Sequence, residues 1–260
     1  MAHALAPLLA RPHEAGVFLD FDGTLSEIVP VASEARPVEG VRELLAGLAT
    51  SFGVVAVVSG RSARELLEWL GPEVEIWGVH GAQRTVHGRV TLSAAVRPYE
   101  ELMGRVRTEA ERAVAESGIA GIAVEDKGVV VTLHHRAATD GRAGAVVDEV
   151  ARALAEDHAL ELAPGRMSVE LRPPVELSKA AVVRDRVRSA RLAAVMFVGD
   201  DTVDLPAFDA LDELASEGIA AVRVGVDSDE APPELIERAD VVVDGPTGVL
   251  ELLRRLAPES

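Results

Sequence analysis

Carboxylates that follow apolar runs are the residues of this chain best suited to chemistry. Asp20 comes directly after the apolar residues 17–19, Asp22 follows two positions later, and Gly23 and Thr24 then form a turn signal. A short apolar run that ends in a turn is typical of a buried parallel strand, and ligands collect beyond the carboxyl ends of such strands. Both carboxylates can therefore reach one point beyond the sheet edge. The alternative is that they only close the strand in an Asx-type turn.

A second acidic group follows the apolar residues 195–198. Asp200, Asp201 and Asp204 lie within five positions of one another, directly after Gly199. Carboxylates at this density repel one another, so the pattern favours a bound cation over the alternative, a solvated acidic loop. Oxygen ligands of this kind suit Mg²⁺.

A hydroxyl residue ends a third apolar run, at residues 53–58. Ser59, Gly60 and Arg61 follow this run and precede an expected helix at 63–70. A hydroxyl beside a glycine and a helix N-terminus can hold a phosphate through Oγ and backbone N–H groups. Ser59 could equally serve only as a helix cap.

Lysine is rare in this chain. Only two of the 26 basic residues are lysines, Lys127 and Lys179, and the rest are arginines. A lysine that persists against this bias is a candidate for a position that needs a compact ammonium, unless the two survived by chance. Lys179 also precedes an expected helix at 180–189. His80 could line a cleft, but a lone histidine is more often structural, so it is left out of the predicted catalytic set.

Composition limits the possible partners. The 260 residues are 48% hydrophobic, enough for a sizeable core, and 43 acidic residues against 26 basic ones give a net charge of −17. This balance disfavours nucleic acid and anionic membranes as partners, and an anionic substrate would need a local positive site. No cysteine is present, so disulfides and thiolate chemistry are excluded. We expect a monomeric cytoplasmic protein. No signal peptide is expected, because the apolar residues 1–10 form a short run that lacks a basic n-region, and no membrane span is expected, since no run approaches about 20 apolar residues.

The order of expected elements indicates an α/β protein with an insertion. Strands and helices alternate at both ends of the chain, as in a Rossmann-like parallel sheet. The middle instead gives the order αββαββ: a helix at 99–117, a hairpin at 119–136, a helix at 140–157, and a hairpin at 159–171 around residues 164–166. We expect a first core part at 1–97, a cap domain at 98–173 and a second core part at 174–260.

The stretch from Asp20 to Thr24 resembles the DxDGT signature of haloacid-dehalogenase-type phosphatases. The resemblance implies that Asp20 attacks phosphorus to form an aspartyl-phosphate and that Asp22 is the general acid and base. Ser59 and Lys179, matching the second and third motifs of that superfamily, would hold the phosphoryl oxygens. The remaining roles that the resemblance implies are substrate binding by Thr24, Gly60 and Arg61, Mg²⁺ binding by Asp20, the backbone carbonyl of Asp22 and Asp200, and indirect or water-mediated metal contacts by Asp201 and Asp204.

Three stretches in the middle of the chain resemble the trehalose-6-phosphate phosphatase family, whose patterns are near ExKG, HYR and GKxxxExRP. These stretches are 125–128, 134–136 and 165–173. The resemblance implies a C2-type cap and a sugar-phosphate substrate, trehalose 6-phosphate. Its sugar hydroxyls, which both donate and accept hydrogen bonds, would contact Glu125, Lys127, Arg166 and Glu170.

The chain departs from the family pattern at several positions. Arg166 stands for lysine, His135 for tyrosine and Ser178 for asparagine, which leaves the expected chemistry intact. Val203 and Leu205 stand where threonine and glutamate are common, which puts the role of Asp204 in doubt.

Two alternatives remain at this stage. One is a related phosphatase acting on sucrose phosphate or a mannosyl-glycerate phosphate. The other is a catalytically silent sugar-phosphate-binding domain, which should have lost Asp20, Asp22 or Lys179.

Overall fold

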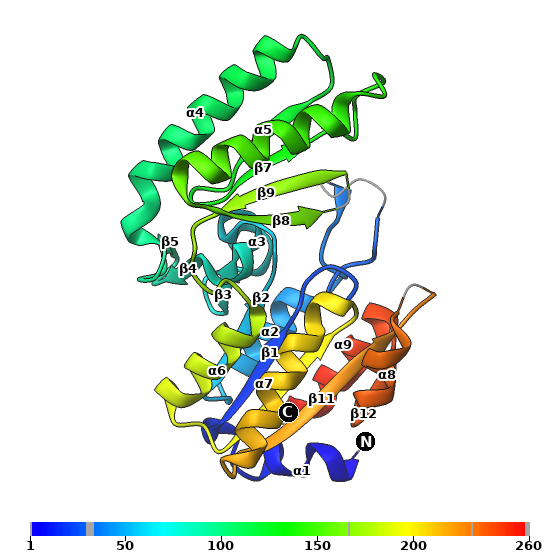
Figure 1. The fold of residues 1–260 in the computed structure, drawn as a ribbon. Helices are drawn as coiled ribbons and strands as arrows, with labels where there is room; N and C mark the ends of the chain where they lie inside the picture. Colours follow the sequence, from blue (N-terminus) through cyan, green and yellow to red (C-terminus); the bar gives the residue numbers. More distant parts are fainter. Residues whose placement is uncertain (1, 30–33, 166, 230, 258–260) are drawn as a thin grey trace. The chain divides into compact units, whose positions relative to one another are not determined.

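The computed structural model describes the whole chain except residues 1, 30–33, 166, 230 and 258–260. The chain forms two compact units (Figure 1). The core unit comprises Met1–Thr91 and Leu177–Ser260, and the cap unit comprises Leu92–Glu176.

The core unit is built on an eight-stranded sheet of order β12-β11-β10-β1-β2-β3-β4-β5. Neighbouring strands from β12 to β3 are parallel, and β4 runs antiparallel to β3. The strands are β1 (Ala15–Leu19), β2 (Val54–Val58), β3 (Glu75–Gly78), β4 (Gln83–Val86), β5 (Arg89–Leu92), β10 (Ala194–Gly199), β11 (Ala220–Asp227) and β12 (Val241–Asp244).

Helices bury both faces of the parallel strands. On one face Val17 and Leu19 of β1 pack in a core cluster with residues of α1, α2, α3 and α9, whereas Phe18 packs on the other face with residues of α6, α7 and α8. Strands covered on both sides must be apolar throughout, which explains their continuous hydrophobic runs. The helices are α1 (Ala2–Ala10), α2 (Val41–Ala49), α3 (Ala63–Leu70), α6 (Lys179–Ala190), α7 (Leu205–Ser216), α8 (Pro233–Arg238) and α9 (Gly245–Leu256).

The cap unit is an antiparallel sheet of order β6-β7-β9-β8 that packs against two helices. Val131, Leu133 and Leu171 are buried, while the register aligns Glu125, Thr132 and Glu170 on the alternate side of the sheet. The elements are α4 (Glu100–Ser117), β6 (Ala123–Asp126), β7 (Val131–His134), α5 (Ala143–His158), β8 (Glu161–Gly165) and β9 (Ser168–Arg172).

The expected α/β class, with a mainly parallel central sheet and a separate antiparallel sheet, is confirmed. One local expectation is wrong. Pro164 and Gly165, predicted to form the second hairpin turn, belong to strand β8. Because β8 is an edge strand, a proline without an N–H group is tolerated there.

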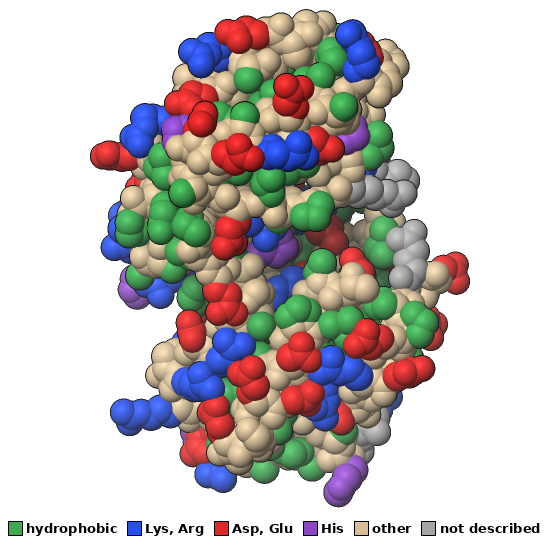
Figure 2. All heavy atoms as spheres, in the orientation of Figure 1, with side chains coloured by type: hydrophobic (Ala, Val, Ile, Leu, Met, Phe, Trp, Pro, Cys, Tyr) green, Lys and Arg blue, Asp and Glu red, His purple; other side chains and the backbone are tan. Residues whose placement is uncertain are grey.

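Short 3₁₀ helices complete the described elements: η1 (Pro12–Glu14), η3 (Val79–Gly81), η4 (Arg97–Tyr99) and η5 (Thr202–Asp204). Acidic and basic side chains are interspersed on the face shown in Figure 2. Within the described residues, the structure contains no helix with the length and apolar character needed to cross a membrane. The cytoplasmic location stays a prediction.

Candidate active site

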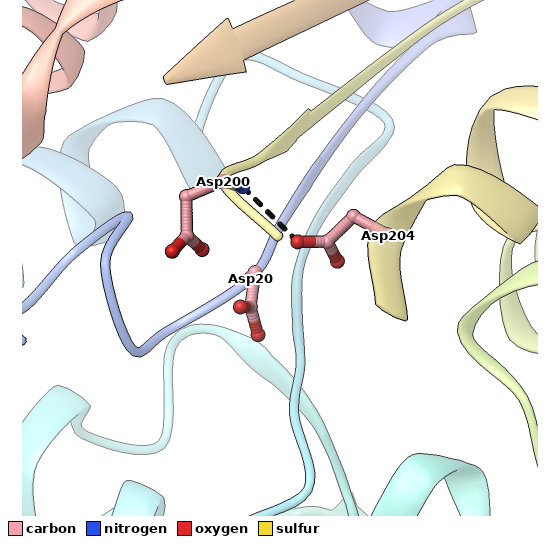
Figure 3. A group of neighbouring side chains, drawn as sticks. All are labelled: Asp20, Asp200 and Asp204. Carbon is pink, nitrogen blue, oxygen red and sulfur yellow. Dashed lines mark hydrogen bonds between the residues drawn. The ribbon is translucent and has the colours of Figure 1, made fainter. Parts of the chain in front are cut away.

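Three aspartates converge where strands β1 and β10 end (Figure 3). Asp20 follows β1, Asp200 follows β10, and Asp204 lies in η5 just beyond. One carboxylate oxygen from each residue lies within 4.8 Å of the others, and all three residues are buried. Because β1 and β10 are parallel neighbours, the topology itself brings these distant parts of the sequence together. We call these three residues the aspartate cluster.

Asp204 is the most deeply enclosed of the three, with no exposed surface. Its Oδ2 accepts hydrogen bonds from the backbone N–H groups of Asp200, at 3.1 Å, and Asp201, at 3.3 Å. A Cβ added to Gly199 would lie 2.4 Å from the Asp204 carboxyl carbon, so only glycine fits there. Asp204 therefore organises the loop that carries Asp200, and Asp201 caps η5.

Lys179 connects two members of the aspartate cluster. It is the first residue of α6, whose N-terminus is capped by the Ser178 hydroxyl accepting from Ala181 N–H. Its Nζ lies 2.7 Å from Asp20 Oδ1 and donates to Asp204 Oδ1 at 2.6 Å. Burial opposes the charge of Lys179, but the two carboxylates outweigh it and raise its pKa above the usual range.

The aspartate cluster carries more negative charge than Lys179 can balance. Burial, reinforced by the charge of Asp204, raises the pKa of Asp20 to about 7 despite the opposing effect of Lys179. Burial and the charges of Asp20 and Asp204 raise the pKa of Asp200 to about 8. Oxygen donors with excess negative charge in a buried site fit a hard divalent cation such as Mg²⁺.

A cavity of about 250 Å³ in the core unit brings the predicted catalytic residues together. Ser59, at the end of β2, is 1% exposed, and its Oγ accepts from the Arg61 backbone N–H at 3.1 Å. The cavity is lined by Asp20, Asp22, Ile28, Ser59, Gly60, His80, Lys179, Asp200, Asp201 and Val203.

His80, which is left out of the predicted catalytic set, lines this cavity. Its backbone has φ 52°, next to Val79 at φ 51°, a left-handed conformation that costs energy in residues other than glycine. A Cβ on Gly60 would lie 2.9 Å from His80 Nε2, so the imidazole packs directly against this glycine. The signal that could have indicated this position is that His80 follows a strand end.

Asp22 and Thr24 each contact another side chain near the cavity. The Asp22 carboxylate forms a two-point ion pair with the Arg61 guanidinium. Thr24 is fully buried, and its hydroxyl lies 3.4 Å from Asp200 Oδ1. Gly23 has φ 75°, and an added Cβ would lie 1.9 Å from Asp200 Oδ2. The turn after β1 is thus packed directly on the Asp200 carboxylate.

The cap unit contains a second polar cluster. Lys127 Nζ donates to Glu170 Oε1 at 3.0 Å, and Glu125 Oε2 lies 2.8 Å from His134 Nε2 and 3.7 Å from Lys127 Nζ. We call this cluster the polar cap face: Glu125, Lys127, Thr132, His134, Glu170 and Arg172. It contains three of the four predicted sugar-binding residues, and Arg166 lies outside the described residues. Strand alternation could have indicated Thr132 and Arg172, which share a side of the sheet with Glu170.

Charges balance on the polar cap face. Burial by itself would raise the pKa of Glu170, but the charges and hydrogen bonds of Lys127 and Arg172 outweigh it and lower the pKa to about 2. Glu170 is therefore a carboxylate held between two cations at neutral pH.

The parallel sheet, with acidic and hydroxyl side chains at its strand ends and the Lys179 ammonium at the start of α6, has the fold of haloacid-dehalogenase-like hydrolases. A solved hydrolase of that class from Bacteroides thetaiotaomicron superposes with a TM-score of 0.65 at 14% identity, covering 93% of this chain and 99% of that one. The chain belongs to the trehalose-phosphatase family, whose model matches residues 18–234.

Relatives agree with this family assignment. A trehalose-phosphate phosphatase of Mycolicibacterium paratuberculosis is 34% identical over 264 residues, which cover 96% of this chain and 64% of the relative. The chain thus spans less than two thirds of that relative's length. The crystal structure of a trehalose-6-phosphate phosphatase related protein has the same fold, with a TM-score of 0.73 at 23% identity, covering 93% of this chain and 96% of that one.

Proposed function

We propose that this chain is a phosphatase that hydrolyses trehalose 6-phosphate to trehalose and phosphate. The observation that carries the proposal is the buried contact of Asp20 with Lys179 beside Asp200 and Ser59 in one cavity. A carboxylate nucleophile, a cation and a hydroxyl around a cavity are the groups that transfer of a phosphoryl group to the enzyme requires. The family membership and the names of the relatives support the substrate.

The reaction proceeds in two displacements. An Asp20 carboxylate oxygen attacks phosphorus, the bond from phosphorus to the sugar oxygen breaks, and Asp22 gives that oxygen a proton. Water then attacks the phosphorus of the aspartyl-phosphate, Asp22 takes the water proton, and the bond from Asp20 to phosphorus breaks, which releases phosphate and restores the Asp20 carboxylate. Ser59 and Lys179 hold the phosphoryl oxygens during both steps.

A divalent cation fits beside these residues. Asp20, Asp200 and the backbone carbonyl of Asp22 are the proposed ligands of Mg²⁺, with Asp201 and Asp204 acting indirectly or through water. Bound Mg²⁺ supplies positive charge that offsets the repulsion between the carboxylate nucleophile and the phosphate dianion. The protein's own contribution is to keep the oxygens together in a buried site, where such charge has its largest effect.

The polar cap face is the proposed binding surface for the sugar. Glu125, Lys127 and Glu170, together with Arg166, would exchange hydrogen bonds with sugar hydroxyls. We propose that the cap unit, predicted at 98–173, sets the choice among sugar phosphates, and that the core unit performs the chemistry. Sucrose phosphate and mannosyl-glycerate phosphate are the competing substrates. A monomeric state stays a prediction.

The test is phosphate release from a panel of trehalose, sucrose, glucose and mannosyl-glycerate phosphates, combined with acid quenching to trap a phosphoenzyme. We expect the highest kcat/KM with trehalose 6-phosphate and a trapped acyl-phosphate in the wild-type protein. Preference for another phosphate in the panel would show that trehalose 6-phosphate is not the main substrate. Binding of trehalose 6-phosphate without release of phosphate would instead indicate a silent domain.

A further inference from the structure

The guanidinium of Arg61 grips the carboxylate of Asp22. Arg61 Nε lies 3.0 Å from Asp22 Oδ1 and 2.8 Å from Oδ2, and Nη2 lies 2.7 Å from Oδ1. A two-point contact between a planar fork and a carboxylate fixes direction as well as distance. The Asp22 side chain is otherwise 45% exposed, so this fork is what orients it.

Arg61 is itself held in place by neighbouring side chains. Its side chain is 10% exposed, and Nη1 donates to Glu65 Oε1 at 3.2 Å. The guanidinium carbon lies 5.4 Å from the centre of the Phe21 ring and 5.3 Å from the Trp69 ring, and these two rings stack at 5.2 Å. Aromatic faces attract a guanidinium, so the stacked rings of Phe21 and Trp69 hold the Arg61 guanidinium in place.

These contacts leave little of the guanidinium for a substrate anion. The edge formed by Nε and Nη2 contacts Asp22, and Nη1 contacts Glu65. A phosphate that bound the edge formed by Nε and Nη2 would have to displace the Asp22 carboxylate. This differs from the role in substrate binding that the resemblance implied for Arg61.

We propose that Arg61 is a positioning residue that orients the general acid Asp22, and not a ligand of the phosphoryl group. The inference rests on the proposed function, because it gives Asp22 the role of proton donor to the leaving oxygen. Phe21 lies between Asp20 and Asp22 in the sequence, and its ring packs against the Arg61 guanidinium. Phe21 therefore helps to position Asp22 indirectly. Loss of the fork removes the orientation of Asp22 and leaves Asp20, Ser59 and Lys179 in place.

The test compares Arg61→Met, Asp22→Asn and the double variant on trehalose 6-phosphate and p-nitrophenyl phosphate. Nitrophenolate leaves without needing a proton, so it does not require an oriented acid. We expect Arg61→Met to lower kcat on trehalose 6-phosphate by at least tenfold and to lower kcat on p-nitrophenyl phosphate by less than threefold, with KM little changed. In the Asp22→Asn background Arg61→Met should add less than twofold.

The expected results differ if Arg61 binds the phosphoryl group of the substrate. Arg61→Met would then raise KM on both substrates, weaken inhibition by inorganic phosphate and act additively with Asp22→Asn; that pattern overturns the inference. Arg61→Lys, which lacks the planar fork, should fail to restore turnover of trehalose 6-phosphate. The matched control is Arg64→Met, which removes the same charge from an exposed position on α3 and should leave both activities unchanged.

A failure of the proposed function can be told apart from a failure of this inference. If the wild-type protein hydrolyses p-nitrophenyl phosphate but not trehalose 6-phosphate, the substrate is wrong, and the same comparison is made with glucose 6-phosphate. If it hydrolyses no ester, the contact is measured as the interaction between Arg61→Met and Asp22→Asn in the free energy of unfolding. Strict additivity there would reject the positioning contact. Where Arg61→Met does not fold, Arg61→Lys carries both measurements.

Discussion

The aspartate cluster of the core unit and the polar cap face are both networks of charged side chains, but the first has an excess of negative charge and the second is balanced. In the core, three buried carboxylates surround the single ammonium of Lys179, and the pKa values of Asp20 and Asp200 are raised. In the cap, Glu170 lies between Lys127 and an arginine, and its pKa is lowered.

The difference indicates what each region is built to bind. A site with uncompensated buried charge is incomplete without a cation, because the repulsion among its carboxylates costs free energy. A site whose charges already neutralise one another can offer oriented donors and acceptors to an uncharged ligand at little electrostatic cost. The core thus suits a metal ion and a phosphate, and the cap suits hydroxyl groups.

Replacing Asp20 should cause the largest loss of activity of all the changes in the core unit. Asp20→Asn removes the proposed nucleophile while keeping its size, so turnover should fall by about 10³-fold or more on every phosphate ester. The trapped phosphoenzyme should disappear with it. Measurement of acid-stable label from a radioactive substrate checks this, and label that survives in Asp20→Asn would mean that another residue is phosphorylated.

Removing divalent cations tests the charge excess in the core directly. In EDTA we expect activity to fall by more than about 100-fold and to return with millimolar Mg²⁺. Added Mg²⁺ should also raise the melting temperature of the wild-type protein, since it binds only the folded state. The rise should be smaller in Asp200→Asn. Full activity in a chelator would contradict the metal assignment.

Lys127 sharpens the comparison from the cap side. Lys127→Arg keeps the charge but replaces a compact ammonium with a planar fork at a contact with Glu170. We expect kcat/KM for trehalose 6-phosphate to fall by about 1–3 kcal/mol in transition-state binding, with activity on p-nitrophenyl phosphate unchanged. An unaltered ratio of the two activities would mean that Lys127 has no role in binding the sugar and that this lysine survived by chance.

The last two expected effects are on the free energy of unfolding, and their signs are opposite in the two regions. The pKa of Asp200 is raised to about 8 from an ordinary value near 4, so stability of the metal-free protein should fall as pH rises between these values. Asp200→Asn should therefore stabilise the metal-free protein at pH 9 by about 1–3 kcal/mol, with a smaller gain near pH 5.

Glu170→Gln is the matching change in the cap. The pKa of Glu170 is lowered to about 2, so its contribution to stability is present above about pH 4.5 and lost as pH falls toward 2. Glu170→Gln should destabilise the protein at pH 7 by about 1–3 kcal/mol, because it removes the carboxylate that pairs with both Lys127 and Arg172. Urea unfolding of both variants across pH measures the sign of each change in the free energy of unfolding. If both substitutions change stability in the same direction, the proposed difference between the two regions is wrong.

The strand ends could be predicted from the sequence because each apolar run stops at the residue that carries the chemistry. Asp20, Ser59 and Asp200 follow this rule, and parallel topology then brings them together. The second hairpin turn could not be placed, since Pro164 signals a turn locally and an edge strand accepts it.

Partners of long side chains could not be predicted either. Arg61 reaches Asp22, 39 positions away, and nothing local to either residue encodes that contact. The central place of Asp204 was equally hidden, because its two hydrogen bonds to backbone N–H groups depend on the loop's fold and not on its composition.

The interruption of the core unit by the cap unit sets an order of events during synthesis of the chain. Strand β1 can pair with β2 soon after both are made, but its other neighbour, β10, emerges only after the whole cap unit. The cap unit is continuous, so its local contacts can form first. Asp20 can therefore gain its contact with Lys179 and its neighbour Asp200 only after the cap unit has been synthesised.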